Sequence, residues 1–324
     1  MRRLLPLLAV FWAALPVCAQ HAEPFVVPSV RETGRPAAYV LERESEERAG
    51  GQVVQSIRVR APLRMRVEAV GEGVIHETWA YGALAVEVEG GVVGPRLGAG
   101  TAFGLLDSLV VFFESGAPGA PPRLLNPHAV RGAFLQAVRA DEDRPGAFGD
   151  LQAVALREDF RARVADPRAL ADLVLDEPRL LHLVRGLRLV PGQTTTEAAE
   201  RESPLTGSAV RTTVTVRLDS LSRDRGTAYV AWRAKADRDA LVASLTRVLE
   251  QAAPGEIDPS FVADLAPTLL LEERATFAFD VATGLVRLMD YVKTARVAGR
   301  ERIERARFRL TGAAGAATPS EAED

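Results

Sequence analysis

The feature that most constrains the fold is an alternation of apolar and polar residues from Val53 to Val70. Apolar side chains occupy most of the odd positions. The even positions include four arginines: Arg58, Arg60, Arg64 and Arg66. Successive side chains of a strand point to opposite faces, so this pattern predicts one long strand with a buried face and a solvated face. Pro62 has no N–H to donate, which predicts an edge position or a bulge there.

Glycine-rich turns flank this strand on both sides and are typical of hairpins. We therefore expect a three-stranded antiparallel meander over 37–89. A one-residue slip would mix the two faces, so the pattern also predicts the register. The expected cross-strand pairs are Glu42 with Arg58, Glu87 with Arg58, Tyr81 with Arg64, and Trp79 with Arg66.

Helices and further hairpins follow the meander. Start and stop signals predict helices over 102–113, from Asn126-Pro127, over 151–164, from Asp166-Pro167, and from Glu177-Pro178 to Gly186. Alternation predicts strands over 187–202, 209–222, 227–236, 273–281, 285–297 and 300–310, with helices opened by Asp237 and Asp258 between them. The last hairpin is expected to pair Lys293 with Glu304, Arg296 with Glu301 and Asp290 with Arg307.

Strands that come in blocks, rather than alternating with helices, favour an α+β fold. We expect a large curved antiparallel sheet built from hairpin and meander blocks, with helices packed on one face. The expected organisation is a signal peptide over 1–19, a flexible leader over 20–35, an N-terminal β-meander with a helical segment over 36–186, C-terminal antiparallel strands with two helices over 187–311, and a disordered tail over 312–324.

The first residues have the pattern of a bacterial secretory signal peptide. Arg2 and Arg3 precede an apolar run over 4–15, and the small residues Val17 and Ala19 suit a cut after Ala19. The apolar run is shorter than the roughly 20 residues that a spanning helix needs, and no transmembrane segment is expected in the mature chain. We expect a periplasmic or secreted protein. Lipid modification of Cys18 and an uncleaved N-terminal anchor are the alternatives.

Cleavage after Ala19 would change the chemistry that the chain can offer. Cys18 is the only cysteine, so the mature chain would have no disulfide and no thiolate. It would keep 38 basic against 43 acidic residues, since only Arg2 and Arg3 leave. This mild acidity argues against nucleic acid as a partner. Only two lysines occur among these bases, which indicates a GC-rich bacterial genome rather than a function.

No catalytic, nucleotide-binding or metal-binding motif is present, so we expect no cofactor, no metal and no catalytic residue. The four histidines, which have no ligand spacing, are His21, His76, His128 and His182. The arginine face is expected to be neutralised by the neighbouring Glu42, Glu44 and Glu46. Binding of an anionic lipid or polymer to that face is the alternative.

The order of elements resembles that of the LolA/LolB-type carriers, and the turn over 280–284 looks like one common in uncharacterised exported bacterial β-rich proteins. The resemblance implies a periplasmic half-barrel that shelters lipid acyl chains. It carries over no binding residue, because it concerns the order of elements and not a site motif.

Three functions remain open. The first is a non-enzymatic exported protein that binds a hydrophobic or amphipathic ligand, such as a lipid, between the apolar strand face and covering helices. The second is a structural or interaction module of the cell envelope with a fully packed core and a protein partner. The third is an envelope hydrolase. For the first, the expected ligand-lining residues are Ile57, Val59, Leu63, Met65 and Val67.

Overall fold

The computed structural model describes residues 23–29, 33–71, 73–90, 109–116, 120–142, 151–203, 205–222, 224, 226–254 and 258–313. The predicted signal peptide and its cleavage site, Cys18, and most of the predicted C-terminal tail lie outside these residues. No described helix has the length and apolar character needed to cross a membrane.

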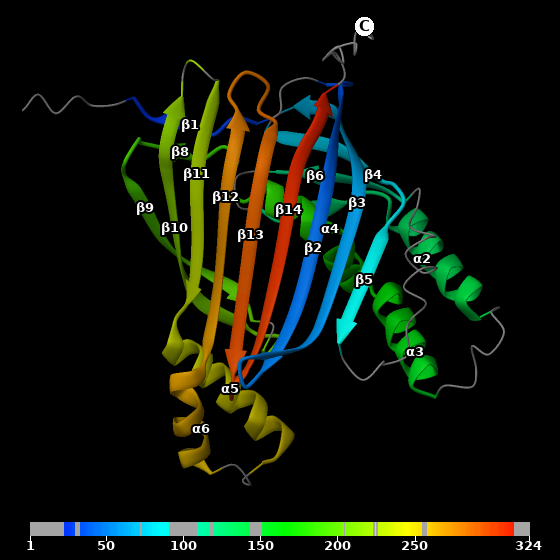
Figure 1. The fold of residues 1–324 in the computed structure, drawn as a ribbon, viewed down its shortest axis with the longest axis vertical. Coiled ribbons are helices and arrows are strands. Elements are labelled where there is room, and N and C mark those ends of the chain that lie inside the picture. The colour runs from blue at the N-terminus through cyan, green and yellow to red at the C-terminus, as the bar shows by residue number, and fades with distance from the viewer. Residues whose placement is uncertain are drawn as a thin grey trace, which may run out of the picture.

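Most of the chain forms one antiparallel sheet of 12 strands (Figure 1). Its strands are β2 (Pro36–Ala49), β3 (Gln52–Gly71), β4 (Val74–Tyr81), β5 (Ala85–Gly90), β6 (Val110–Ser115), β7 (Arg123–Leu124), β9 (Thr194–Glu202), β10 (Ala209–Ser222), β11 (Thr227–Ala236), β12 (Leu270–Asp280), β13 (Val286–Val297) and β14 (Arg300–Ala313). The short strands β1 (Phe25–Val26) and β8 (Arg188–Leu189) pair separately. The helices are α2 (Pro127–Glu142), α3 (Leu151–Ala165), α4 (Pro167–His182), α5 (Arg238–Ala252), α6 (Pro259–Leu265) and the 3₁₀ turn η1 (Ala266–Thr268).

The strand order is β7-β6-β4-β3-β2-β14-β13-β12-β11-β10-β9, and β5 pairs with the free part of β3. β14 therefore lies between β2 and β13 and joins strands from the two ends of the chain. The sheet does not close, since β7 and β9 are its two ends in the described part. These findings confirm the α+β class with a large antiparallel sheet.

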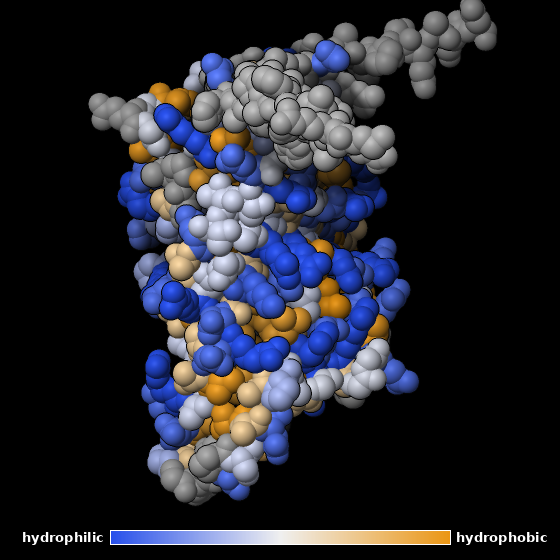
Figure 2. Space-filling model, turned by 90° about the vertical axis from the view of Figure 1, so that its left-hand side faces the viewer, coloured by the Kyte–Doolittle hydropathy of each residue, from blue (hydrophilic) through white to orange (hydrophobic). Residues whose placement is uncertain are grey.

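The core lies between the inner face of the sheet and α4, which crosses behind the strands in Figure 1. Trp79 is fully buried there, with edge-on contacts to Phe113 at 5.6 Å and Phe308 at 6.1 Å between ring centroids. A smaller core lies at the end of the sheet near α5 and includes Leu241, Leu271 and Ala295. The surface on the β9 and β10 side is mostly hydrophilic, with separate hydrophobic areas in its middle and near its lower end (Figure 2).

The register of the first hairpin differs from the prediction by two residues. Glu42 lies opposite Arg60 rather than Arg58, because a two-residue turn and a bulge at Glu47 each shift the pairing by one. The total shift is two residues, and side chains alternate between faces with a period of two. The buried and solvated faces of β2 and β3 therefore remain as predicted.

The third strand of the predicted meander is in fact two strands. β5 pairs with β3 in the predicted register, with Arg58 opposite Glu87. β4 pairs in a register shifted by one residue through a bulge at Glu68, so the predicted pairs of Arg64 with Tyr81 and of Arg66 with Trp79 are both wrong. Arg64 lies opposite Ala80 and Arg66 opposite Thr78, which places Trp79 and Tyr81 on the inner face instead of the arginine face.

Pro62 explains where the break between β4 and β5 falls. Its carbonyl oxygen accepts a hydrogen bond from the Gly82 N–H at 2.8 Å, so its missing N–H faces the same gap between the two strands. A Cβ at Gly82 would lie 2.7 Å from Cγ of Pro62, which leaves room for glycine only. The break is therefore set by a proline in β3 and by the glycine that directly follows β4.

Three helix and strand predictions need correction. The helix over 102–113 is wrong at 110–113, which belong to β6; the start of that range lies outside the described residues. Glu177-Pro178 does not open a helix, because α4 continues through Pro178. Burial of Leu175 and Leu181 on both sides of that proline outweighs the lost hydrogen bond. The strand over 187–202 is interrupted by a turn at 191–192.

Candidate functional site

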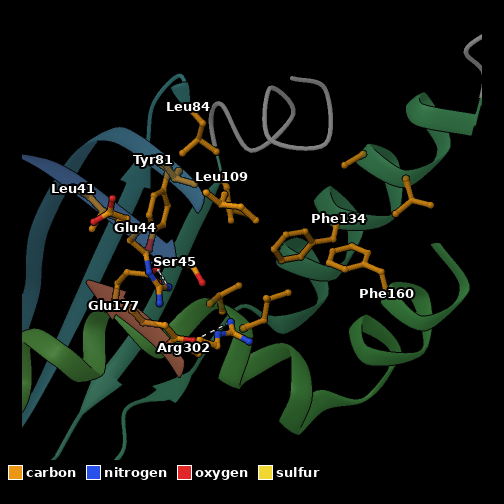
Figure 3. Close-up of a pocket in the computed structure, with 18 residues that line it drawn as sticks. Leu41, Glu44, Ser45, Tyr81, Leu84, Leu109, Phe134, Phe160, Glu177 and Arg302 are labelled. Carbon is orange, nitrogen blue, oxygen red and sulfur yellow. Dashed lines mark hydrogen bonds and ion pairs between the residues drawn. The ribbon is translucent and has the colours of Figure 1, made fainter. Parts of the chain in front are cut away.

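A cavity of about 420 Å³ lies between the inner face of β2, β3 and β4 and the helices α2, α3 and α4 (Figure 3). This volume falls within the range of small-molecule sites, ~300–1,000 Å³. Most of its wall is apolar. The apolar members are Leu41, Ile57, Val59, Tyr81, Leu84, Leu109, Phe134, Ala137, Val138, Phe160, Leu173 and Val174.

The helical wall is built around two aromatic rings. Phe134 of α2 and Phe160 of α3 meet edge to face, with 5.6 Å between their ring centroids. Figure 3 shows both rings pointing across the cavity toward Tyr81 and Leu109. Leu173 of α4 also lines the cavity and remains 44% exposed, so this apolar wall continues to the surface.

The break between β4 and β5 contributes directly to the opposite wall. Leu84 lies in that break and lines the cavity. The interruption that Pro62 and Gly82 impose on the sheet thus places an apolar side chain at the site.

An ion-pair cluster forms the polar end of the cavity. The Arg43 guanidinium contacts Glu177 at 2.7 Å and Asp176 at 3.0 Å. Burial raises the pKa of the Glu177 carboxyl, and repulsion from Asp176 raises it further, against the attraction of Arg43. Arg302 and Glu304 of β14 lie at the same end, where they pair with each other at 2.9 Å. A mostly apolar chamber with charged groups at one end suits an amphipathic molecule.

The predicted ligand-lining residues separate into two groups. Ile57 and Val59 line the cavity. Leu63, Met65 and Val67 lie further along the same face of β3, each 1% exposed, and pack in the core instead. Alternation identifies the inner face of a strand, but it does not tell which part of that face a helix covers closely. A ligand-binding role for these five residues remains a prediction.

Sequence reasoning missed most of the helical wall. The apolar stripe of α2 was recognisable in the sequence and includes Phe134, Ala137 and Val138, yet it indicated only a buried face. Phe160 and Val174 lie on other helices, and nothing in their spacing shows that the three helices stand apart enough to leave a cavity.

Two of the four arginines of the arginine face pair with the predicted glutamates, whereas Arg66 pairs with Glu68 of its own strand at 2.7 Å. Glu46 pairs with Arg48 and Arg305 rather than with this face. Arg58 binds Glu44 at 2.8 Å, and Arg60 lies 3.7 Å from Glu42 on the neighbouring strand. Glu44 also accepts from Arg305 of β14 at 2.7 Å. These pairs lie on the outer face of the sheet and bind strands β3, β2 and β14 to one another.

His182, the most buried of the described histidines, is held in a closed cluster. His182 Nε2 lies 3.0 Å from Glu77 Oε1, and the Arg185 guanidinium lies 3.0 Å from Nε2 and 3.1 Å from Nδ1. Arg185 binds the same Glu77 oxygen at 2.7 Å, and Ser115 Oγ approaches Nε2 at 3.4 Å. Burial, with the charge of Arg185, lowers the pKa of His182.

This arrangement does not resemble a working serine triad. A neutral His182 that donates from Nε2 to Glu77 and accepts from Arg185 at Nδ1 has no free nitrogen to take the Ser115 proton. Ser115, Glu77 and Arg185 are also each exposed by no more than 5%. The cluster is therefore suited to fixing α4 on the sheet.

The other histidines are dispersed. His76 lies on the outer face of β4, 3.5 Å from Glu114, and His128 is exposed in the first turn of α2. His21 lies outside the described residues. Across the described part of the chain, no three His, Cys, Asp or Glu side chains come together as metal ligands would.

No protein-family model matches the sequence, and no curated protein matches it. Solved structures give distant likenesses at 8–9% identity. A structure titled for lipid–protein interactions in lipovitellin has a TM-score of 0.42 over 90% of this chain, and the chain spans only 27% of that protein. An outer membrane channel from Pseudomonas putida F1 has a TM-score of 0.20, covering 86% of this chain and 96% of the other. A DUF1329 family protein from Desulfovibrio piger has a TM-score of 0.14, covering 85% and 86%. All three scores are below 0.5, so the functional argument rests on the geometry of the site.

Proposed function

We propose that this protein is an exported, non-enzymatic binding protein that holds the hydrocarbon part of a hydrophobic or amphipathic ligand in the cavity between the sheet and α2–α4. The observation that carries the proposal is the cavity itself: about 420 Å³, walled by Phe134, Phe160 and other apolar side chains. The signal-peptide pattern of the first 19 residues supports export.

Burial of hydrocarbon supplies the binding energy in this proposal. Each methylene removed from water contributes ~0.8 kcal/mol. Two further carbons in a chain should then tighten binding by roughly tenfold, until the chain no longer fits. This dependence on chain length distinguishes binding in a cavity of finite size from binding to an exposed apolar surface.

The test is displacement of an environment-sensitive fluorescent fatty acid by saturated chains of 6 to 16 carbons. Saturable binding with a maximum at an intermediate length is expected. Ala137→Phe should weaken binding at least tenfold, because Ala137 lines the cavity and is 2% exposed. Gln136→Phe is the matched control, since Gln136 precedes it on α2 with an exposed side chain.

Two results would contradict the proposal. The first is absence of saturable binding by folded protein, as judged by circular dichroism. The second is equal binding by the Ala137→Phe and Gln136→Phe variants, which would place the ligand elsewhere.

The packed half of the sheet favours a second candidate function, a structural module of the cell envelope. Leu63, Met65 and Val67 are each 1% exposed and belong to the hydrophobic core, as a scaffold requires. Failure of every chain length to bind would leave this scaffold as the better account.

A further inference from the structure

A polar row crosses the inner face of the sheet, and the rows on either side of it carry Arg43 and Arg302. Ser45, Glu304, Lys293 and Glu273 are direct cross-strand partners on β2, β14, β13 and β12. Residues directly opposite each other share a face, so all four point to the side on which the cavity lies. The two rows on either side include Tyr291 and Ala295, which are buried.

Both carboxylates of this row have other partners. Glu273 accepts from Arg201 and from the Tyr291 hydroxyl, each at 2.9 Å. Glu304 pairs with Arg302 at 2.9 Å. Lys293 lies between the two carboxylates and forms no ion pair or hydrogen bond with either, because each carboxylate already pairs with an arginine.

Lys293 also lines a second cavity, again of about 420 Å³. Ala295, Val297 and Leu205 contribute apolar wall to it. Arg302 and Glu304 line both this cavity and the first, so the two chambers adjoin at that ion pair. A molecule whose chain fills the first chamber would place its polar end at Arg302 and Lys293.

We propose that Lys293, with Arg302 beside it, binds an anionic group, a carboxylate or a phosphate, at the end of a hydrocarbon chain held in the first cavity. The Lys293 ammonium is half-buried and has no hydrogen-bond or ion-pair partner among the described residues, and the oxygens of a ligand anion would supply acceptors for it. This inference rests on the proposed function, because it assigns the head of the same ligand.

The composition of the chain provides a matched control. Lys235 is the only other lysine, and it lies exposed on the outer face of β11 in the same sheet. Lys293→Met should weaken binding of dodecanoate and dodecyl phosphate by at least tenfold and leave dodecanol unchanged. Lys235→Met should change none of the three.

Amine labelling gives a second readout that does not depend on affinity. Reductive methylation followed by peptide mass spectrometry reports the reactivity of each lysine separately. Saturating dodecyl phosphate should protect Lys293 at least fivefold while Lys235 stays reactive. Inorganic phosphate at the same concentration should protect neither, since the chain supplies most of the binding energy.

The outcomes separate this inference from the proposed function. If dodecanol binds as tightly as dodecanoate and Lys293→Met has no effect, the head-group assignment is wrong while the cavity function stands. Preference for dodecyltrimethylammonium would also overturn the assignment. Protection of Lys293 by inorganic phosphate alone would show a free-anion site that is independent of the chain. Failure of all chains to bind would overturn the proposed function itself.

Discussion

Glu77 gives the sharpest test of how the fold is held together. Its carboxylate is 0% exposed and accepts from Arg185 at 2.7 Å, from His182 at 3.0 Å and from Trp79 Nε1 at 3.1 Å. These contacts hold its pKa well below the ordinary value, against the effect of burial. In Glu77→Gln the amide cannot neutralise Arg185, which is itself 5% exposed.

The expected cost follows from the charge left behind. Breaking a buried ion pair on one side costs about 3–5 kcal/mol, because the remaining charge has no partner. For a domain of this size, that corresponds to a fall in Tm of roughly 5–15 °C. Glu200→Gln, an exposed position on β9, should change the free energy of unfolding by less than ~0.5 kcal/mol.

Chemical denaturation monitored by circular dichroism would measure both variants. The double variant Glu77→Met with Arg185→Met should recover much of the loss, since it removes both charges together. The reasoning is refuted if Glu77→Gln costs less than about 1 kcal/mol, or if the double variant is less stable than the single one.

Three further predictions concern pH, backbone packing and processing. The free energy of unfolding should fall as pH falls below 6.5, the ordinary pKa of histidine, because His182 takes up a proton in the unfolded chain but not in the folded one, where its pKa is lowered. His182→Gln should flatten this part of a plot of Tm against pH. Gly82→Ala should destabilise by about 1–3 kcal/mol through its clash with Pro62, whereas Gly71→Ala, which meets nothing within 4 Å, should not; equal Tm values for the two would contradict the packing argument. The intact mass of exported protein should correspond to a chain that begins at Gln20, and a diacylglyceryl group on Cys18 would show lipid modification instead.

The faces of the strands were the most predictable part of the fold. Period-two alternation follows from strand geometry alone, so the inner position of Ile57 and the outer position of Arg58 could be inferred directly. The last hairpin was predicted residue by residue, since Asp290 with Arg307 and Arg296 with Glu301 are complementary only in one register. A bulge such as the one at Glu68 leaves no comparable pattern in the sequence, and this bulge shifts the pairing of β4 with β3 by one residue.

Tertiary packing decided what the local signals could not. Pro178 is a strong helix-start signal, yet it lies inside α4 because the apolar residues around it are buried on the sheet. The cavity depends on how far apart Phe134 and Val59 are held, and no local pattern encodes that separation. The cluster of Glu77, His182 and Arg185 likewise joins residues up to 108 positions apart.

The position of β14 also determines when the sheet can be completed. Thr311 bonds to Ala38 across 273 positions of sequence, so β2 keeps an unpaired edge until almost the whole chain is present. Long-range pairing of this kind slows folding, and an open strand edge invites pairing with other chains. In the export that we propose, the chain would have to stay unfolded until translocation. Late arrival of β14 delays completion of the sheet, and until then the open edge of β2 would benefit from a chaperone that prevents pairing with other chains.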